Sequence, residues 1–285
     1  MKDQFYLVIN AEDVVTTPLD WHSRHLYESR TPYLEDNIRR SISMFEGVCD
    51  PENIFVLCDQ RKAGMLMGSL TELNKRHIIP LPGSKASALS MAAICAKVSQ
   101  KGEQAQMIFT PINTIQPERT QFIQSLYQAL FNTCFRQIII ALGVVEKQEV
   151  STNEQLVIDS TENTMTKKVW QLVKSKNMRT NRQSTSFETW QNSRIYIGHA
   201  STFLNAFKQH KKEAYQRLAL TRNVFNTPDE QRYINRMLSL LSSATFEASI
   251  LPKISNLFTL PIHVKHHELD IENITEGMLE LTGSA

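Results

Sequence analysis

The sequence lacks an excess of charge of either sign. Its 285 residues contain 31 Lys and Arg against 29 Asp and Glu, which gives a formal net charge of +2 at pH 7. A protein that is attracted to nucleic acid or to an anionic membrane usually carries a broad basic balance. We therefore expect neither nucleic acid nor membrane as a partner of this chain.

Cysteine is sparse, and long apolar runs are absent. The four cysteines are widely spaced, and no CxxC pair predicts a structural zinc site. This usage is typical of buried thiols in a reducing compartment rather than of a disulfide framework. No apolar run is long enough for a signal peptide or a membrane span. These absences predict a cytoplasmic protein, or one secreted without a signal peptide.

What the sequence does contain is a regular alternation of short apolar runs and amphipathic stretches. The apolar runs predict buried strands at Phe5–Ile9, Ile54–Cys58, Met107–Thr110, Gln137–Leu142, Trp170–Val173 and Arg194–Ile197. Helical spacing predicts helices at Leu34–Phe45, Lys62–Asn74, Ser87–Gln100 and Arg119–Asn132. This β-α-β-α succession predicts an α/β fold with a mainly parallel, doubly wound, Rossmann-like sheet.

The second half of the chain departs from this alternation. A polar stretch from Glu146 to Lys168 predicts a projecting hairpin or insertion. The composition then becomes helical, with helices expected at Lys208–Arg222 and Glu230–Ser243 before a last strand-like run at Leu257–His267. We expect one domain over residues 1–285, made of a first half (1–145), a second half with a helical C-terminal lobe (146–272) and a tail (273–285).

Segments spread along the chain, in a fixed order, carry a family resemblance. Tyr6 to Leu19, Trp190 to Ser193 and Thr245 to Lys253 are the longest, and shorter ones are Pro32-Tyr33-Leu34 with Arg39-Arg40, Asn53 to Val56, Leu81-Pro82-Gly83 and Ala200 to Leu204. Together they resemble the mannose-1-phosphate guanylyltransferases, which are sugar-nucleotide pyrophosphorylases. The resemblance extends to about Ile271 and implies the nucleotide-diphospho-sugar transferase fold. It also implies that residues 1–145 are a nucleotide-binding-like half and residues 146–272 a sugar-phosphate-side half.

The glycine-rich phosphate loop of that family is replaced here. Between the first strand and Pro-Leu the family has a glycine-rich turn with an arginine, whereas this chain has Asn10-Ala11-Glu12-Asp13-Val14-Val15-Thr16-Thr17. A triphosphate must approach bare backbone N–H groups, which glycine permits and side chains obstruct. Glu12 and Asp13 also add negative charge. The sequence therefore predicts an inherited scaffold whose pyrophosphorylase chemistry is lost or severely weakened.

The metal site that the resemblance implies is altered as well. The family's aspartate after the central strand corresponds to Asn113, and its late Asp-Val-Gly aspartate corresponds to Asp270. An amide carries no charge and is a poorer magnesium ligand than a carboxylate. Asn113 and Asp270 are therefore the metal candidates, and Mg²⁺ is expected only if the protein is catalytic.

The resemblance also implies which residues face a ligand. The ligand-binding candidates are Asn10, Ala11, Gly83, Asn192, Arg194 and Lys176. Arg194 stands where the family has a glycine after Trp-Asn-Ser. Together with Lys174 and Lys176 it forms a new basic cluster, which fits either a rebuilt anion site or a solvated charged rim. The catalytic candidates are Lys174, Lys253 and Glu247, where Glu247 keeps the charge of the family's Ser-Ile-Asp-Tyr aspartate.

These residues leave more than one function open. The first is a pseudoenzyme that binds a nucleotide, a sugar phosphate or a protein partner and has a ligand-binding or regulatory role. The second is an active nucleotidyltransferase with a rebuilt site, which makes a GDP-mannose-like nucleotide sugar from a nucleoside triphosphate and a sugar 1-phosphate. A glycosyltransferase needs a short acidic motif after a central strand, and Pro111 to Thr114 has none. A homodimer is suggested only by the resemblance.

Overall fold

The computed structural model describes residues 5–11, 31–82, 88–102, 105–112, 117–145, 154–161, 163–174, 186–219, 222–240 and 244–264. The strands in these residues are β1 (Phe5–Asn10), β2 (Ile54–Asp59), β3 (Ile78–Leu81), β4 (Gln106–Pro111), β5 (Ile139–Val144), β6 (Glu154–Asp159), β7 (Lys167–Lys174), β8 (Phe187–His199) and β9 (Leu257–Ile262). The α-helices are α1 (Thr31–Met44), α2 (Gln60–Ser69), α3 (Ala88–Ser99), α4 (Arg119–Phe135), α5 (Ala200–His210), α6 (Lys212–Ala219), α7 (Glu230–Leu240) and α8 (Phe246–Ser249).

The sheet is mixed, with the strand order β3-β2-β1-β4-β8-β5-β9-β7-β6. β1, β2, β3 and β4 pair with one another in parallel, and β5 pairs in parallel with β9. β8 lies between β4 and β5 and is antiparallel to both. The α/β prediction is confirmed, and the prediction of a mainly parallel sheet describes β1 to β4 rather than the sheet as a whole.

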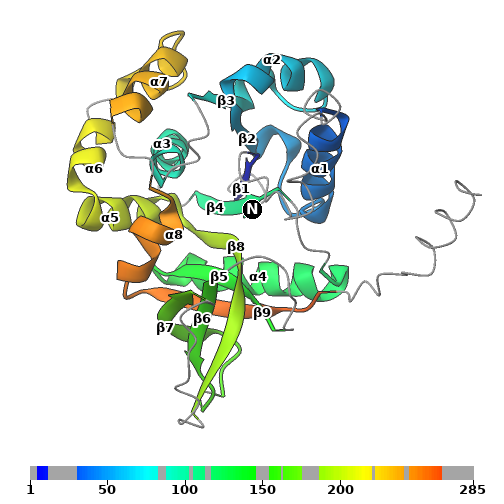
Figure 1. Ribbon diagram of the computed structural model, residues 1–285, viewed down its shortest axis with the longest axis vertical. Coiled ribbons are helices and arrows are strands. Elements are labelled where there is room, and N and C mark those ends of the chain that lie inside the picture. Colours follow the sequence, from blue (N-terminus) through cyan, green and yellow to red (C-terminus); the bar gives the residue numbers. More distant parts are fainter. Residues whose placement is uncertain are drawn as a thin grey trace, which may run out of the picture.

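The long strand β8 belongs to two parts of the sheet. Its second half pairs with β4, and its first half pairs with β6. Because β6 also pairs with β7, and β7 with β9, the strands β8, β5, β9, β7 and β6 form a closed ring of pairings. Figure 1 shows the start of β8 extending away from the rest of the sheet together with the β6–β7 hairpin. This hairpin lies where the polar stretch of the sequence predicted one.

The core lies on both faces of the sheet, as β1 illustrates. Tyr6 and Val8 belong to one buried apolar cluster, and Leu7 and Ile9 belong to the other. Successive side chains of a strand point to opposite faces, so a strand that is buried on both faces needs a continuous apolar run. The first cluster contains residues of α3, α5, α6, α7 and α8, and the second contains residues of α1, α2 and α4. The helices thus cover the sheet from both sides (Figure 1).

Two elements differ from the sequence prediction for visible reasons. The single helix expected at Lys208–Arg222 is the end of α5 followed by α6, because Lys211 leaves helical geometry with φ −141° and ψ 57°. The four-residue strand β3 contains Pro80 and was not predicted. It lies at the edge of the sheet, where a proline is tolerated because one ladder of hydrogen bonds is absent.

Helix α4 begins at Arg119, as the sequence predicted, and Glu118 is its N-cap. The Glu118 side chain accepts hydrogen bonds from the N–H groups of Thr120 (3.1 Å) and Gln121 (2.7 Å). Such a cap satisfies donors that have no partner within the helix. Within the described residues, no helix combines the length and the apolar character that crossing a membrane requires.

Candidate functional site

A crevice lies at the carboxyl ends of β1 and β4. Asn10 and Pro111 end these two strands and line the crevice, together with Arg194 and Tyr196 from β8 and Glu247 from α8. The space between the lining residues is about 30 Å³. In open α/β sheets, ligands bind outside the carboxyl ends of the parallel strands. The further lining residues are Leu57, Ser90, Met91, Phe109, Thr110 and Phe246.

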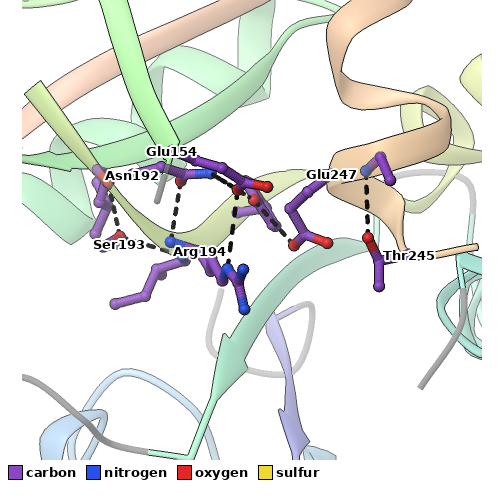
Figure 2. Close-up of polar contacts among 10 residues, drawn as sticks. Glu154, Asn192, Ser193, Arg194, Thr245 and Glu247 are labelled. Atoms are coloured by element: carbon purple, nitrogen blue, oxygen red, sulfur yellow. Dashed lines mark hydrogen bonds and ion pairs between the residues drawn. The ribbon is translucent and has the colours of Figure 1, made fainter. Parts of the chain in front are cut away.

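A chain of side-chain hydrogen bonds connects two carboxylates at this crevice (Figure 2). Asn192 is fully buried, and its Nδ2 donates to the hydroxyl of Tyr196 (2.9 Å) and to Oε2 of Glu154 (3.3 Å). The Tyr196 hydroxyl donates in turn to Oε1 of Glu247 (3.1 Å). The network therefore fixes the start of β6 and helix α8 to the middle of β8. Fully paired polar networks of this kind are rigid.

The backbone of Arg194 is held in an unusual conformation. Its φ is 62°, in the left-handed region that favours glycine. Its N–H donates to Oδ1 of Asn192 (3.0 Å), and the next N–H, of Ile195, donates to Oγ of Ser193 (3.1 Å). The same Ser193 hydroxyl donates to the carbonyl oxygen of Leu142 in β5 (2.6 Å). Two side chains of β8 thus keep Arg194 in this conformation.

The basic residues of the site lie around one carboxylate, Glu154. Nε of Arg194 is 3.9 Å from Oε2 of Glu154, and both side chains are largely buried, at 26% and 13% exposure. The β6–β7 pairing places Lys174 directly opposite Glu154. Burial raises the pKa of Glu154, Arg194 acts in the opposite direction, and the nearby charge of Glu247 raises the pKa further. Burial, followed by the charge of Glu247, likewise raises the pKa of Tyr196.

The structure brings only some of the predicted site residues together. Asn10, Asn192, Arg194 and Glu247 meet at or next to the crevice. Ala11 packs in an apolar cluster, and its N–H donates to the carbonyl oxygen of Leu57 (2.8 Å). The exposed Lys253 ends a short 3-10 turn, Leu251–Lys253, and is not one of the lining residues. Gly83, Asn113, Lys176 and Asp270 lie outside the described residues.

Comparison with known proteins found a likeness in the structure of this chain and not in its sequence. No protein-family model matches the sequence. No curated protein matches it either. Mannose-1-phosphate geranyltransferase from Thermus thermophilus superposes with a TM-score of 0.70, covering 92% of this chain and 75% of that one at 10% identity. Mannose-6-phosphate isomerase from Helicobacter pylori gives 0.63, covering 92% of this chain and 98% of that one at 13% identity.

The chain has the nucleotide-sugar transferase fold. This finding agrees with the fold that the sequence resemblance implied. Identities this low establish the fold alone, and they do not distinguish one activity on the fold from another. The function must therefore be argued from the residues at the crevice.

Two residues of the site, Tyr196 and Glu154, were not predicted from the sequence. Tyr196 was assigned only to an apolar strand, although Asn192 and Tyr196 are four residues apart and share one face of β8. That spacing was an available signal. Glu154 lay within the polar stretch and became a site residue only through the pairing of β6 with β8. Nothing in the local sequence indicates that pairing.

The carboxylates described at the crevice are held by other side chains of the protein. Among the described residues no three His, Cys, Asp or Glu side chains are grouped so as to hold a metal ion. At the crevice, Glu247 accepts from Tyr196, and Glu154 is engaged by Asn192 and Arg194. Mg²⁺ prefers six oxygen ligands in an octahedron, often with one or two carboxylates free to coordinate it. The described side chains do not offer such a set.

Proposed function

We propose that this chain is a binding protein for a phosphorylated hexose, of the mannose phosphate class, and that it does not transfer a nucleotidyl group. The phosphate end of the ligand reaches the crevice at the ends of β1 and β4, whose free space of about 30 Å³ is too small for a whole hexose phosphate, and the rest of the ligand lies outside it. Two solved structures with the same fold are named for mannose phosphates, which supports this class of ligand. The bound state serves a regulatory role.

The observation that carries this proposal is the conformation of Arg194. The family that the sequence resembles has glycine at this position, where a left-handed conformation costs little. A non-glycine residue there is strained by about 1–3 kcal/mol, and such strain is found mainly at functional sites. The strained backbone places a guanidinium at the crevice, and guanidinium is well suited to bind phosphate.

The other groups at the crevice suit the hydroxyls of a sugar. Glu247 offers a carboxylate, which accepts hydrogen bonds from hydroxyl groups, and Asn10, which also lines the crevice, offers an amide. Tyr196 and Asn192 fix the carboxylate of Glu247 in place. A rigid, preorganised set of polar groups binds a ligand at a lower entropic cost than a flexible set.

The loss of nucleotidyl transfer is supported at the end of β1. A triphosphate needs backbone N–H groups there, but the N–H of Ala11 is already bonded to the carbonyl oxygen of Leu57. Glu12 and Asp13 follow in the sequence and are of the same charge sign as phosphate. Stabilising the leaving pyrophosphate requires positive charge or a metal ion at this place.

Calorimetric titration and thermal unfolding test the proposal. Mannose 1-phosphate and GDP-mannose are expected to bind without metal, and ligand at a hundred times its dissociation constant stabilises by about 2.7 kcal/mol. The variant Arg194→Gly restores the glycine, so it is expected to fold at least as stably as the parent and to bind about tenfold more weakly or worse. Arg217→Gln, on the exposed side of α6, is the matched control.

Two outcomes overturn the proposal in different ways. Unchanged affinity in Arg194→Gly shows that the crevice is not the binding site. Stabilisation by GTP that requires Mg²⁺, together with release of pyrophosphate, shows an active nucleotidyltransferase that uses residues such as Lys174, Lys253 or Asp270. The first outcome concerns ligand binding at the crevice, and the second concerns the absence of nucleotidyl transfer. Each can therefore be tested without the other.

A further inference from the structure

A second pocket lies at the opposite edge of the sheet from the crevice. The β4–β8 pairing places His199 opposite Gln106, at the amino end of β4, whereas the crevice lies at the carboxyl end. The pocket has a volume of about 550 Å³ and is lined by the ends of α3 and α4 and the beginning of α5. Pockets of about 300–1,000 Å³ commonly hold small molecules. The described lining residues include Phe135, Arg136, His199, Ser201, Asn205 and Tyr215.

The amino end of helix α5 points its donors at this pocket. The helix has eleven residues, and its N-cap residue, His199, makes no side-chain cap. The N–H of Ala200 donates to the carbonyl oxygen of Ala105 (2.9 Å), but the N–H groups of Ser201 and Thr202 have no acceptor within the helix. A helix amino end also carries partial positive charge from the aligned peptide dipoles. Together these properties favour an anion.

An independent observation at the same place is the state of His199. Its side chain lines the pocket and is only 7% exposed, and its Nδ1 has no hydrogen-bond partner among the described groups. Oγ1 of Thr202, in the first turn of α5, is likewise buried without a described partner. Buried polar atoms are almost always paired, because leaving one unpaired costs free energy. Thr202 is not one of the lining residues of the pocket, so the unpaired atom of His199 is the one that points to a polar ligand here.

The charge of the surroundings has one sign. Arg136 lines the pocket, and its guanidinium lies 4.7 Å from the centre of the Phe258 ring, which orients it. An adjoining hollow of about 600 Å³ shares Asn205 and Tyr215 with the pocket and adds Lys208 and Lys212. Among the described lining residues of both hollows there is no Asp or Glu. The two hollows thus form one groove, and the charged side chains among its described lining residues are all positive.

We propose that this groove binds a phosphate-bearing small molecule. The phosphate lies at the amino end of α5, between His199 and Arg136. The remainder of the molecule extends past Tyr215 toward Lys208 and Lys212. Guanidinium and helix-terminal N–H groups are among the strongest phosphate ligands that proteins use. The site is separate from the crevice, so the protein holds two phosphorylated ligands.

The exposed thiol of Cys134 reports on this groove in the unmodified protein. Cys134 lines the pocket and is exposed, whereas the other three cysteines are buried. Iodoacetamide is therefore expected to label Cys134 first. Inorganic pyrophosphate, ribose 5-phosphate and ATP, each added without metal, distinguish a phosphate site from a sugar-phosphate or nucleotide site. A probe that binds in the groove is expected to slow the labelling of Cys134 and to give a binding isotherm by calorimetry.

Matched variants connect the protection to the proposed residues. Arg136→Gln is expected to weaken binding about tenfold or more, since a charge-assisted hydrogen bond is lost. Arg119→Gln, at the other end of α4, is expected to leave it unchanged. Arg194→Gly affects only the crevice ligand, so failure of the proposed function and failure of this site give different results.

Three outcomes overturn the inference. The first is that none of the three probes slows labelling of Cys134 at millimolar concentration. The second is protection of Cys134 that Arg136→Gln leaves unchanged in a variant whose circular dichroism matches the parent. The third is loss of the protection in Arg194→Gly, which assigns the ligand to the crevice instead.

Discussion

Glu154 is the residue on which the charges of the crevice converge. It accepts from Asn192, faces Arg194 at 3.9 Å and is paired across strands with Lys174. Burial nevertheless outweighs these partners and raises its pKa above the ordinary value of 4.5. The folded protein therefore retains a proton on Glu154 that the unfolded chain releases as pH rises above that value. At neutral pH, the buried carboxylate of Glu154 therefore lowers the free energy of unfolding.

The variant Glu154→Gln removes this titration. In the parent, the contribution of Glu154 to the free energy of unfolding is fully present below its ordinary pKa and is lost as pH rises through the raised value. We expect the unfolding free energy of the variant, minus that of the parent, to increase as pH rises from about 4 to about 7. Urea unfolding at a series of pH values measures it.

A control separates this effect from general charge removal. Glu52→Gln, in the exposed first turn after Asp50, removes a carboxylate at the surface. Its difference from the parent measures the effect of removing a surface carboxylate over the same pH range. A difference for Glu154→Gln that does not change with pH would contradict the assignment.

Single residues of the site were predicted from the sequence only where a motif pointed to them. Asn192, Arg194 and Glu247 follow from the Trp-Asn-Ser and Ser-Ile-Asp-Tyr resemblances, and the structure places all three at one network. The sequence predicted a cluster of basic residues but did not predict the carboxylate of Glu154 beside it. Glu154 reaches the cluster only because β6 pairs with β7 and β8. Such partners depend on strand pairing between distant segments, which local patterns do not encode.

Among the elements, the pairing of β5 with β8 determines the geometry of the site. The register shifts between Ala141 and Gly143, next to the segment where Ser193 bonds to the carbonyl oxygen of Leu142. A Cβ on Gly143 would lie 2.9 Å from Oγ1 of Thr259 and 2.9 Å from Cε3 of Trp190. Glycine is therefore required here so that β5, β8 and β9 can approach one another closely.

Two glycine substitutions test this packing with opposite signs. Gly143→Ala is expected to lower the free energy of unfolding by about 1–3 kcal/mol, because buried neighbours must move. Gly68→Ala, within α2, has nothing within 4 Å of the added Cβ and is expected to raise it by about 0.5–1 kcal/mol. Urea unfolding of both variants measures the change. Equal effects of the two substitutions would contradict the packing argument.

Elements with a strong local pattern were predicted well, and others were not. β1, β2 and β4 each contain a run of consecutive apolar residues because both faces of the sheet are covered, and this run is visible in the sequence. β6 has a mixed burial pattern and β3 has only four residues, so neither gives a clear period. The break between α5 and α6 occurs within a basic run that continues the helical composition, and only tertiary packing decides it.

At the scale of the whole molecule, a buried ion pair joins helix α7 to helix α3. Nζ of Lys97 in α3 lies 2.5 Å from Oε1 of Glu230 in α7, and the two side chains are 6% and 12% exposed. The other oxygen of Glu230 accepts from the N–H of Asn226 (2.6 Å). Gln231 adds a hydrogen bond from α7 to the carbonyl oxygen of Pro80 in β3 (2.6 Å). Helix α7 is therefore fixed to both α3 and β3.

Removing one member of this pair is expected to be costly. Lys97→Met leaves Glu230 buried without its cation and should lower the free energy of unfolding by about 3–5 kcal/mol. The double variant Lys97→Met/Glu230→Gln should cost less than Lys97→Met alone, because no charge remains unpaired. Arg217→Met, which breaks an exposed pair with Glu213, should cost under about 1 kcal/mol. Urea unfolding compares the three variants, and a double variant that is the least stable would contradict this account of the pair.

The arrangement of the sheet has a consequence for how the protein behaves at high concentration. The strands β8, β5, β9, β7 and β6 close on themselves, with β7 and β9 joined only at Lys167–Thr259 and Lys168–Phe258, so the end strand outside this ring among the described strands is β3. There, Pro80 has no N–H to donate, and its carbonyl oxygen is already occupied by Gln231. An extended segment of another chain finds few groups to pair with. This end strand thus discourages the strand-to-strand stacking that begins aggregation.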